Sequence, residues 1–81
     1  MNEAQKTLLR MVADHEGEWG WYKIEMTLSM RGSEYIHVPN TMIALINDGL
    51  ITSTGDVQSA TTRYSLTDKG REMIKFLETE N

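Results

Sequence analysis

Apolar residues near the N-terminus recur at intervals of three and four positions, which is the spacing of one face of an α-helix. This stripe consists of Ala4, Leu8, Met11, Val12 and His15. Asn2 followed by Gln5 resembles a capping box at the start of the helix, and Gly17 is a natural left-handed terminator beyond its end. The pattern therefore predicts a helix that runs to about Asp14 or His15, followed by a loop over residues 16–20.

Residues 21–31 carry two competing patterns. The apolar residues that alternate, as in an amphipathic strand, are Tyr22, Ile24, Met26, Leu28 and Met30. The segment is also rich in Lys, Glu, Met and Leu, which are good helix formers, and a helix would place Trp21, Ile24 and Leu28 on one face. We therefore expect a helix from Trp21 to Arg31. The tyrosine and the two methionines would then form a second apolar face, which either packs between two other helices or lies exposed.

The segment from Val38 to Asp48 has another helical pattern. Its apolar stripe is Met42, Leu45 and Ile46. Gly49 stands where a helix ends in the left-handed conformation, and Pro39 falls in the first turn, where its missing N–H costs no hydrogen bond. The residues that fall away from the stripe form a small, neutral, hydrogen-bonding outer face. They are Asn40, Thr41, Ala44 and Asn47.

The stretch after this helix combines two strand patterns with a turn. Leu50 to Thr54 is short and β-branched, and Ala60 to Leu66 alternates so that one face, with Thr62 and Tyr64, can be buried. The polar run from Gly55 to Ser59 predicts a five-residue connection between the strands. We therefore expect a β-hairpin.

Thr67 is suited to cap the last helix, because its hydroxyl can accept a backbone N–H and Asp68 supplies a negative charge in the first turn. The helix is expected to end at about Thr79. Its buried stripe is Met73, Ile74 and Leu77. Gly70 falls in the middle of that stripe and predicts the close approach of another backbone.

The chain has 81 residues, enough for one domain with one modest core, and we expect a single α+β domain over residues 1–81. It has no cysteine, which excludes disulfides and thiolate metal sites. No apolar run approaches the length of a membrane span and the N-terminus lacks the apolar segment of a signal peptide, so we expect a cytoplasmic protein without membrane contact. The net charge of −4 argues against strong non-specific affinity for nucleic acids.

Catalysis has little support in this sequence. His15 and His37 are the only imidazole bases, and no nucleophile lies at a spacing that would serve them. His15 sits at a helix end on an apolar stripe, where a packing role is expected. The chain also lacks a glycine-rich phosphate loop after a strand and the carboxylate spacing of a metal loop. We therefore expect no enzyme, no cofactor and no metal site.

Trp19 and Trp21 flank Gly20 in the loop before the second helix. Such a pair can stack on single-stranded bases. It can also anchor the loop into the small core, and this use is favoured for Trp21 because aromatic area dominates core energetics.

Three segments together resemble winged helix-turn-helix regulators, most closely the PadR group and more distantly the MarR group. The segments are GWYKIEMTL at Gly20–Leu28, MIALINDGLI at Met42–Ile51 and RYSLTDKGRE at Arg63–Glu72. They resemble the start of that family's second helix, the end of its recognition helix, and its wing strand with the following helix. The resemblance implies a winged helix with a three-helix core, a β-hairpin wing and a C-terminal helix. It also implies a homodimer that binds double-stranded DNA through the third helix and the wing.

The resemblance further implies a small transcriptional regulator with particular DNA contacts. Asn40 and Thr41 would reach base edges, with Ala44 beside them on the outer face of the third helix. Phosphate contacts from the second helix, the turn and the wing would come from Lys23, Arg31, His37, Thr61 and Arg63.

Two large apolar side chains, Leu9 and Phe76, are displaced from the buried stripes of their helices. Each is either an ordinary surface or peripheral core residue or a partner contact. The first and last helices of a winged helix commonly lie side by side, so the two residues would form one patch and the dimer interface. The alternative function is a protein-interaction module or inhibitor that binds a protein partner, through this patch or through Tyr22, Met26 and Met30.

Overall fold

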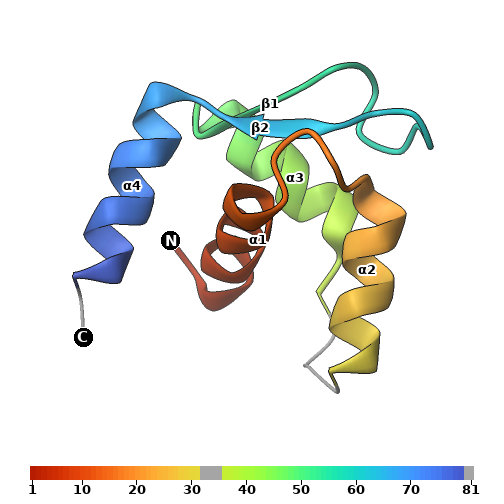
Figure 1. Cartoon of the computed structure of the whole chain (residues 1–81), viewed down its shortest axis with the longest axis horizontal. Helices are drawn as coiled ribbons and strands as arrows, with labels where there is room; N and C mark the ends of the chain where they lie inside the picture. Colours follow the sequence, from red (N-terminus) through yellow and green to blue (C-terminus); the bar gives the residue numbers. More distant parts are fainter. Residues whose placement is uncertain (32–35, 80–81) are drawn as a thin grey trace.

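Residues 1–31 and 36–79, which the computed structural model describes, form four helices and one antiparallel hairpin (Figure 1). The elements follow in the order α1 (Glu3–Asp14), α2 (Trp21–Met30), α3 (Val38–Asn47), β1 (Ile51–Ser53), β2 (Tyr64–Leu66) and α4 (Asp68–Glu78). The α+β class and this order are as predicted. None of the described helices is long and apolar enough to cross a membrane.

The predicted capping box begins α1. The Asn2 side chain accepts the Gln5 N–H at 2.8 Å, and the Gln5 side chain accepts the Asn2 N–H at 3.0 Å. Gly17 has the positive φ of 69° that the sequence predicts for the turn after the helix. These local signals explain why the predicted bounds of this helix are correct.

Leu9 is fully buried, and its predicted place on the surface is wrong. The reason is the position of α1, which packs against α3, α4 and β2 and lies between α4 and α3 in the ribbon view (Figure 1). A helix covered from several sides buries more than one stripe. The expected surface patch of Leu9 with Phe76 is therefore absent, although Phe76 itself is 60% exposed.

The helix prediction for residues 21–31 is confirmed, with α2 ending at Met30 and Arg31 as its C-cap. Ile24 and Leu28 are buried against the core. The second apolar face lies exposed, with relative exposures of 60% for Tyr22, 47% for Met26 and 84% for Met30. Of the two arrangements that the sequence allowed for this face, the structure has the exposed one.

His37 caps the start of α3, where its Nδ1 atom accepts the Asn40 N–H at 3.2 Å. Pro39 lies in the first turn, as predicted, and it is buried together with Met42 and Leu45. The helix ends before Gly49, whose φ of 75° is the expected left-handed conformation. This helix therefore has one fully buried side and one outer side.

The hairpin pairs Ile51 with Leu66 and Ser53 with Tyr64 in antiparallel register. Its strands are shorter than predicted and the five-residue connection is wrong, because residues 54–63 fold into a compact loop. The Thr62 hydroxyl donates to the Asp56 carbonyl oxygen at 2.6 Å inside this loop. One backbone bond continues beyond the strands, from the Thr54 N–H to the Arg63 carbonyl oxygen at 3.1 Å. Side-chain and turn hydrogen bonds replace the rungs expected further out.

The predicted close approach at Gly70 is also present. A Cβ atom on this residue would overlap the carbonyl oxygen of Leu50. The Thr67 hydroxyl caps α4 by accepting the Gly70 N–H at 3.0 Å, and it donates to the Gly49 carbonyl oxygen at 2.5 Å. The start of α4 is therefore fixed against the end of α3.

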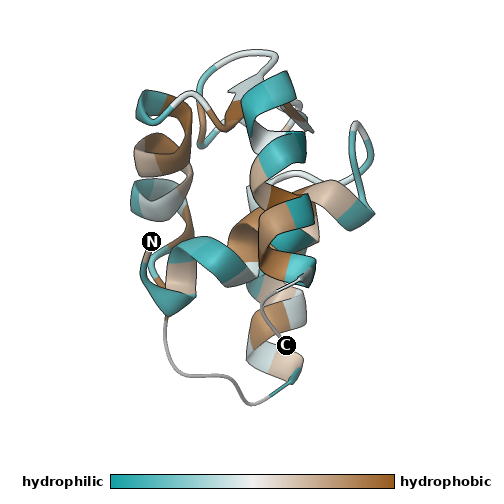
Figure 2. Ribbon diagram, turned by 90° about the vertical axis from the view of Figure 1, so that its left-hand side faces the viewer, coloured by the Kyte–Doolittle hydropathy of each residue, from teal (hydrophilic) through white to brown (hydrophobic). Residues whose placement is uncertain are grey.

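Buried apolar residues from all four helices and both strands share one core. Each helix carries both hydrophobic and hydrophilic residues, as expected for amphipathic helices (Figure 2). Two of the three residues of the predicted α4 stripe, Met73 and Ile74, are only partly buried, while Leu77 is buried. The core holds α3 and the hairpin in fixed positions relative to each other.

Candidate nucleic-acid interface

The outer side of α3 is formed by Asn40, Ile43 and Asn47, which are all exposed. They follow one another at intervals of three and four residues and therefore lie along one side of the helix. Thr41 and Ala44, which the sequence placed on this face, are half-buried at its edge. The Thr41 hydroxyl donates to the His37 carbonyl oxygen at 3.0 Å, so its proton is used within the helix.

Sequence reasoning missed Ile43, which is 46% exposed. The signal was present, because successive helical residues are about 100° apart and Ile43 then falls about 60° beyond the arc of Met42, Leu45 and Ile46. The outer face of α3 is therefore two amides with a branched apolar side chain between them. Nothing in Val38–Asn47 adds a positive charge to it.

The predicted phosphate-binding cations fall into two groups. Lys23 and Arg63 line the same hollow, between the start of α2 and the hairpin loop. Arg31 and His37 lie at the two helix ends that residues 32–35 connect, and both are exposed. The structure thus brings Lys23 and Arg63 to one hollow, whereas Arg31 lies at the opposite end of α2 and His37 at the start of α3.

Arg63 is held against its own loop. Its Nη1 atom donates to the carbonyl oxygens of Ala60 at 3.1 Å and Thr62 at 2.9 Å, and the residue is half-buried. Its backbone N–H donates to the Thr54 hydroxyl at 3.0 Å. A guanidinium fixed in this way presents its charge at a defined place, with little freedom to follow a moving ligand.

The hairpin loop is also attached to the rest of the molecule. Trp21 donates from its Nε1 atom to the Gln58 carbonyl oxygen at 2.9 Å, a contact that the sequence did not predict. Its ring is partly buried against the core, as predicted. The Tyr64 hydroxyl donates to the Val57 carbonyl oxygen at 2.5 Å, and burial raises the pKa of Tyr64 to about 12. Thr61 is exposed on this loop, with its hydroxyl 3.2 Å from that of Ser59.

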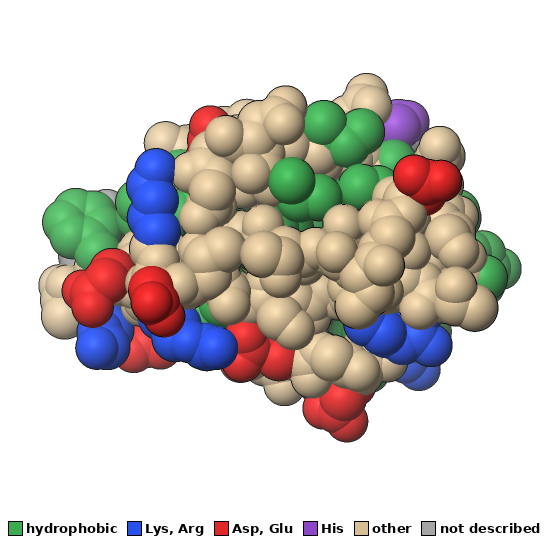
Figure 3. All heavy atoms as spheres, turned by 90° about the horizontal axis from the view of Figure 1, so that it is seen from above, with side chains coloured by type: hydrophobic (Ala, Val, Ile, Leu, Met, Phe, Trp, Pro, Cys, Tyr) green, Lys and Arg blue, Asp and Glu red, His purple; other side chains and the backbone are tan. Residues whose placement is uncertain are grey.

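A second hollow, of about 710 Å³, separates α3 from the loop. Ile43, Ile46 and Val57 contribute apolar side chains to it, and Asp56 is also among its lining residues. In the view onto the hairpin, hydrophobic side chains gather near the middle and acidic and basic side chains are interspersed around them (Figure 3). This surface can contact base edges or another apolar surface. The negative charge of Asp56 would repel a phosphate beside it.

His15 has the packing role that the sequence predicts. Its ring stacks on that of Trp19 with centroids 3.5 Å apart and an interplanar angle of 4°. The Lys23 ammonium lies over the same indole, 5.4 Å from the ring centroid. The tryptophan that precedes α2 is therefore held between the end of α1 and the first turn of α2.

Comparison of this chain with protein-family models, curated proteins and solved structures finds no match. The resemblance to the PadR and MarR groups accordingly stays a prediction that rests on the sequence motifs.

Proposed function

We propose that this chain is a winged-helix protein that binds double-stranded DNA, with α3 as its recognition helix. The observation that carries the proposal is the outer side of α3, where Asn40, Ile43 and Asn47 are exposed on a helix whose other side is buried. The helix pair α2 and α3 with a following hairpin has the order of a helix-turn-helix with a wing. A rigid helix of this kind fits the major groove.

The chemistry of this face favours A·T base pairs. An asparagine side chain can bond adenine through both N6 and N7, and an apolar side chain can contact the thymine methyl group. Asn40 and Asn47 are about 10 Å apart along the helix axis, or roughly three base-pair steps. Ile43 lies between them, so one helix would read a short A·T-containing half-site.

Phosphate contacts would flank that half-site. Arg31 lies at the end of α2 and His37 at the start of α3. Lys23 and Arg63 line the hollow between the start of α2 and the hairpin loop, which also carries Thr61. These groups would fix the orientation of the helix without reading sequence. Thr41 and Ala44, at the edge of the α3 face, would define how deeply the helix enters the groove.

One short helix with few cations is not enough for a specific complex of roughly 10 kcal/mol or more, so two copies would act together as a homodimer. Phe76, exposed on α4, is the remaining apolar candidate for the interface now that Leu9 is buried. Sedimentation of the unmodified chain at about 100 μM should show a dimer that Phe76→Glu converts into a folded monomer. Monomer alone at that concentration would remove this interface from the proposal.

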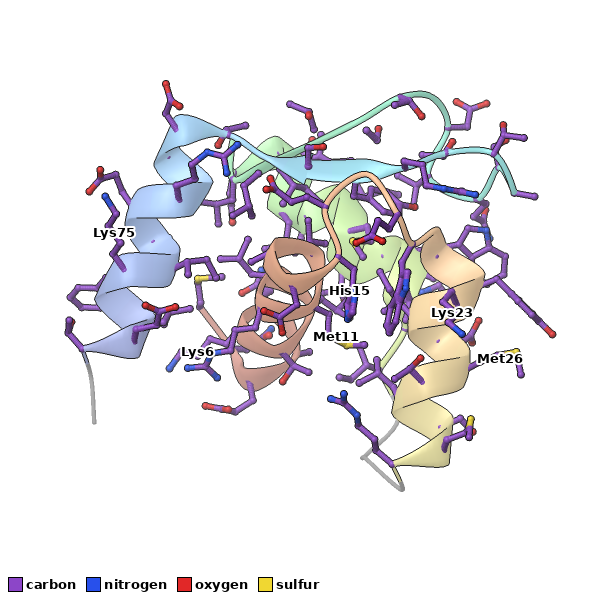
Figure 4. The ribbon with its side chains drawn as sticks, in the orientation of Figure 1. Lys6, Met11, His15, Lys23, Met26 and Lys75 are labelled. Atoms are coloured by element: carbon purple, nitrogen blue, oxygen red, sulfur yellow. The ribbon has the colours of Figure 1, made fainter. Side chains whose placement is uncertain are left out.

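The direct test is selection of duplexes from a fully randomised pool by the tagged chain at low salt. The expected result is an enriched motif that contains A·T pairs and that changes when Asn40 or Asn47 is replaced by alanine. Lys75→Ala is the matched control, because Lys75 is 74% exposed on α4 and lies on the opposite side of the molecule from α2 (Figure 4). Failure to enrich any motif would contradict DNA recognition.

The exposed face of α2 favours one second candidate, a protein-interaction module. Tyr22, Met26 and Met30 form an apolar stripe at intervals of four residues, and Met26 points away from α1 (Figure 4). The same selection separates the two functions. DNA recognition predicts that Met26→Glu and Met30→Glu leave the enriched motif unchanged, and an empty selection by the unmodified chain favours the protein partner.

A further inference from the structure

The hollow between the start of α2 and the hairpin loop has a volume of about 540 Å³. That volume lies within the range of small-molecule sites in proteins. Its aromatic wall comes from Trp19, Trp21 and Tyr22, and the loop contributes Gln58 and Arg63. Residues from distant parts of the chain therefore meet around one space.

The aromatic wall is held in place by contacts within the protein. The stacking of His15 fixes the plane of Trp19. Trp21 meets Tyr22 edge to face, with centroids 5.7 Å apart and an angle of 88°, and its Nε1–H is bonded to the Gln58 carbonyl oxygen. The surface is therefore preorganised, and binding of a stacked ligand would cost little free energy for ordering these side chains.

The charge around the hollow differs from that of the whole chain. Lys23 and Arg63 supply two positive charges and Glu18 one negative charge, so the lining is positive although the chain carries a net charge of −4. The Lys23 ammonium lies over the Trp19 ring, and the Arg63 guanidinium is fixed by the carbonyl oxygens of Ala60 and Thr62. The hollow thus combines flat aromatic side chains with the two positive charges of Lys23 and Arg63.

We propose that this hollow binds a planar aromatic anion of one or two fused rings. The ring lies against the Trp21 indole and the Tyr22 phenol, since His15 and Lys23 already cover Trp19. The carboxylate or sulfonate of the ligand faces Lys23 and Arg63. The site is independent of the proposed DNA function, because it needs no nucleic acid to form. The two are linked in one respect, since the same two cations are the proposed phosphate contacts and a bound anion would compete for them.

The test uses 2-naphthoate as the probe, titrated into the full chain labelled with ¹⁵N. We expect the indole N–H signals of Trp19 and Trp21 to shift together and to saturate. The neutral 2-naphthol and the cationic 2-naphthylmethylamine should bind more weakly in that order. Equal binding of all three probes, or no saturable shift of either indole at millimolar probe, would overturn the proposal.

Substitutions of the two cationic residues test where the carboxylate of 2-naphthoate binds. Lys23→Ala, at an exposed position, and Arg63→Ala should each weaken 2-naphthoate by up to about fivefold, the effect of a solvent-accessible ion pair, and should not weaken 2-naphthol. Lys75→Ala on α4 should leave both affinities unchanged. Unchanged 2-naphthoate affinity in the Lys23 variant would contradict the assigned site. Because no DNA is present, these outcomes are separate from success or failure of the duplex selection.

Discussion

The Glu16 carboxylate accepts the Leu66 backbone N–H at 2.7 Å, across 50 positions of sequence. Arg71 of α4 approaches the same carboxylate, with its Nη1 atom 3.2 Å from Oε2. The hydrogen bond from Leu66, and then the hydrogen bond and the charge of Arg71, hold the pKa of Glu16 below its ordinary value of 4.5, against the opposing effect of desolvation. One side chain therefore connects the loop after α1 with β2 and α4.

This connection predicts a pH-dependent stability. A carboxyl whose pKa is lowered by folding stabilises the native state above its unfolded pKa, and the contribution disappears as the pH falls through the folded pKa. Glu16→Ala should lower the free energy of unfolding by about 1 kcal/mol at pH 7, a modest value because the side chain is 30% exposed. Urea denaturation at pH 7 and pH 3 measures the change.

At pH 3 the difference between Glu16→Ala and the unmodified chain should be smaller than at pH 7. Glu78→Ala, at an exposed position on α4, is the control and should change stability little at either pH. A Glu16→Ala effect of the same size at both values would show that the carboxylate charge contributes nothing.

Gly70→Ala should destabilise the protein even though alanine favours helices. The added Cβ atom has no room beside the Leu50 carbonyl oxygen, which is backbone and cannot move as a side chain would. We expect a loss of about 2 kcal/mol or more, as for other overpacked sites. Thermal denaturation measures this loss, and Glu72→Ala, at an exposed position of the same helix, should stay close to the unmodified chain. A stabilised Gly70→Ala protein would contradict the close approach.

Leu9 and Phe76 should differ sharply in their contribution to stability. Leu9→Ala empties a fully buried position and should cost about 2–5 kcal/mol. Phe76→Ala should change stability by about 0.5 kcal/mol or less, because this side chain is 60% exposed. Chemical denaturation of the two variants measures both values. Similar losses at the two positions would contradict the packing of α1 between α3 and α4.

The helices could be predicted because their signals are local. Asn2 and Gln5 are neighbours on one turn, and Thr67 caps the amide of Gly70 three residues later. Met42 and Leu45 on the buried side of α3 likewise follow from spacing, whereas Ile46 of the same predicted stripe is only half-buried. For such elements, short-range geometry and hydrophobic periodicity contain most of the information.

The burial of Leu9 and the fold of residues 54–63 depend on contacts between distant segments. Leu9 is buried on a helix against which α3, β2 and α4 pack, and all three are distant from it in the sequence. The loop is held by Trp21, which donates across 37 positions to Gln58. The spacing of hydrophobic residues along the sequence contains no information about a hydrogen bond between such distant residues. The position of the proposed phosphate contacts could not be predicted either, since Lys23 and Arg63 line one hollow only because of how this loop folds.

The proposed DNA complex should show a shallow dependence on salt. The candidate set contains at most four cationic side chains, Lys23, Arg31, His37 and Arg63. A plot of log affinity against log salt concentration should therefore have a slope of at most about 4 in magnitude for each protomer. Fluorescence anisotropy with a random duplex at several salt concentrations measures this slope. A slope near −9, which corresponds to about ten phosphate contacts, would mean that the interface lies elsewhere.

The most direct test of the central claim compares Asn40→Ala with Arg63→Ala on one selected duplex and one scrambled duplex, by fluorescence anisotropy at fixed salt. If α3 reads base edges, Asn40→Ala reduces the preference for the selected duplex by about 1–3 kcal/mol, or roughly 5- to 150-fold, and leaves binding to the scrambled duplex unchanged. Arg63→Ala weakens binding to both duplexes alike. A preference that is the same in Asn40→Ala as in the unmodified chain would contradict α3 as the recognition helix.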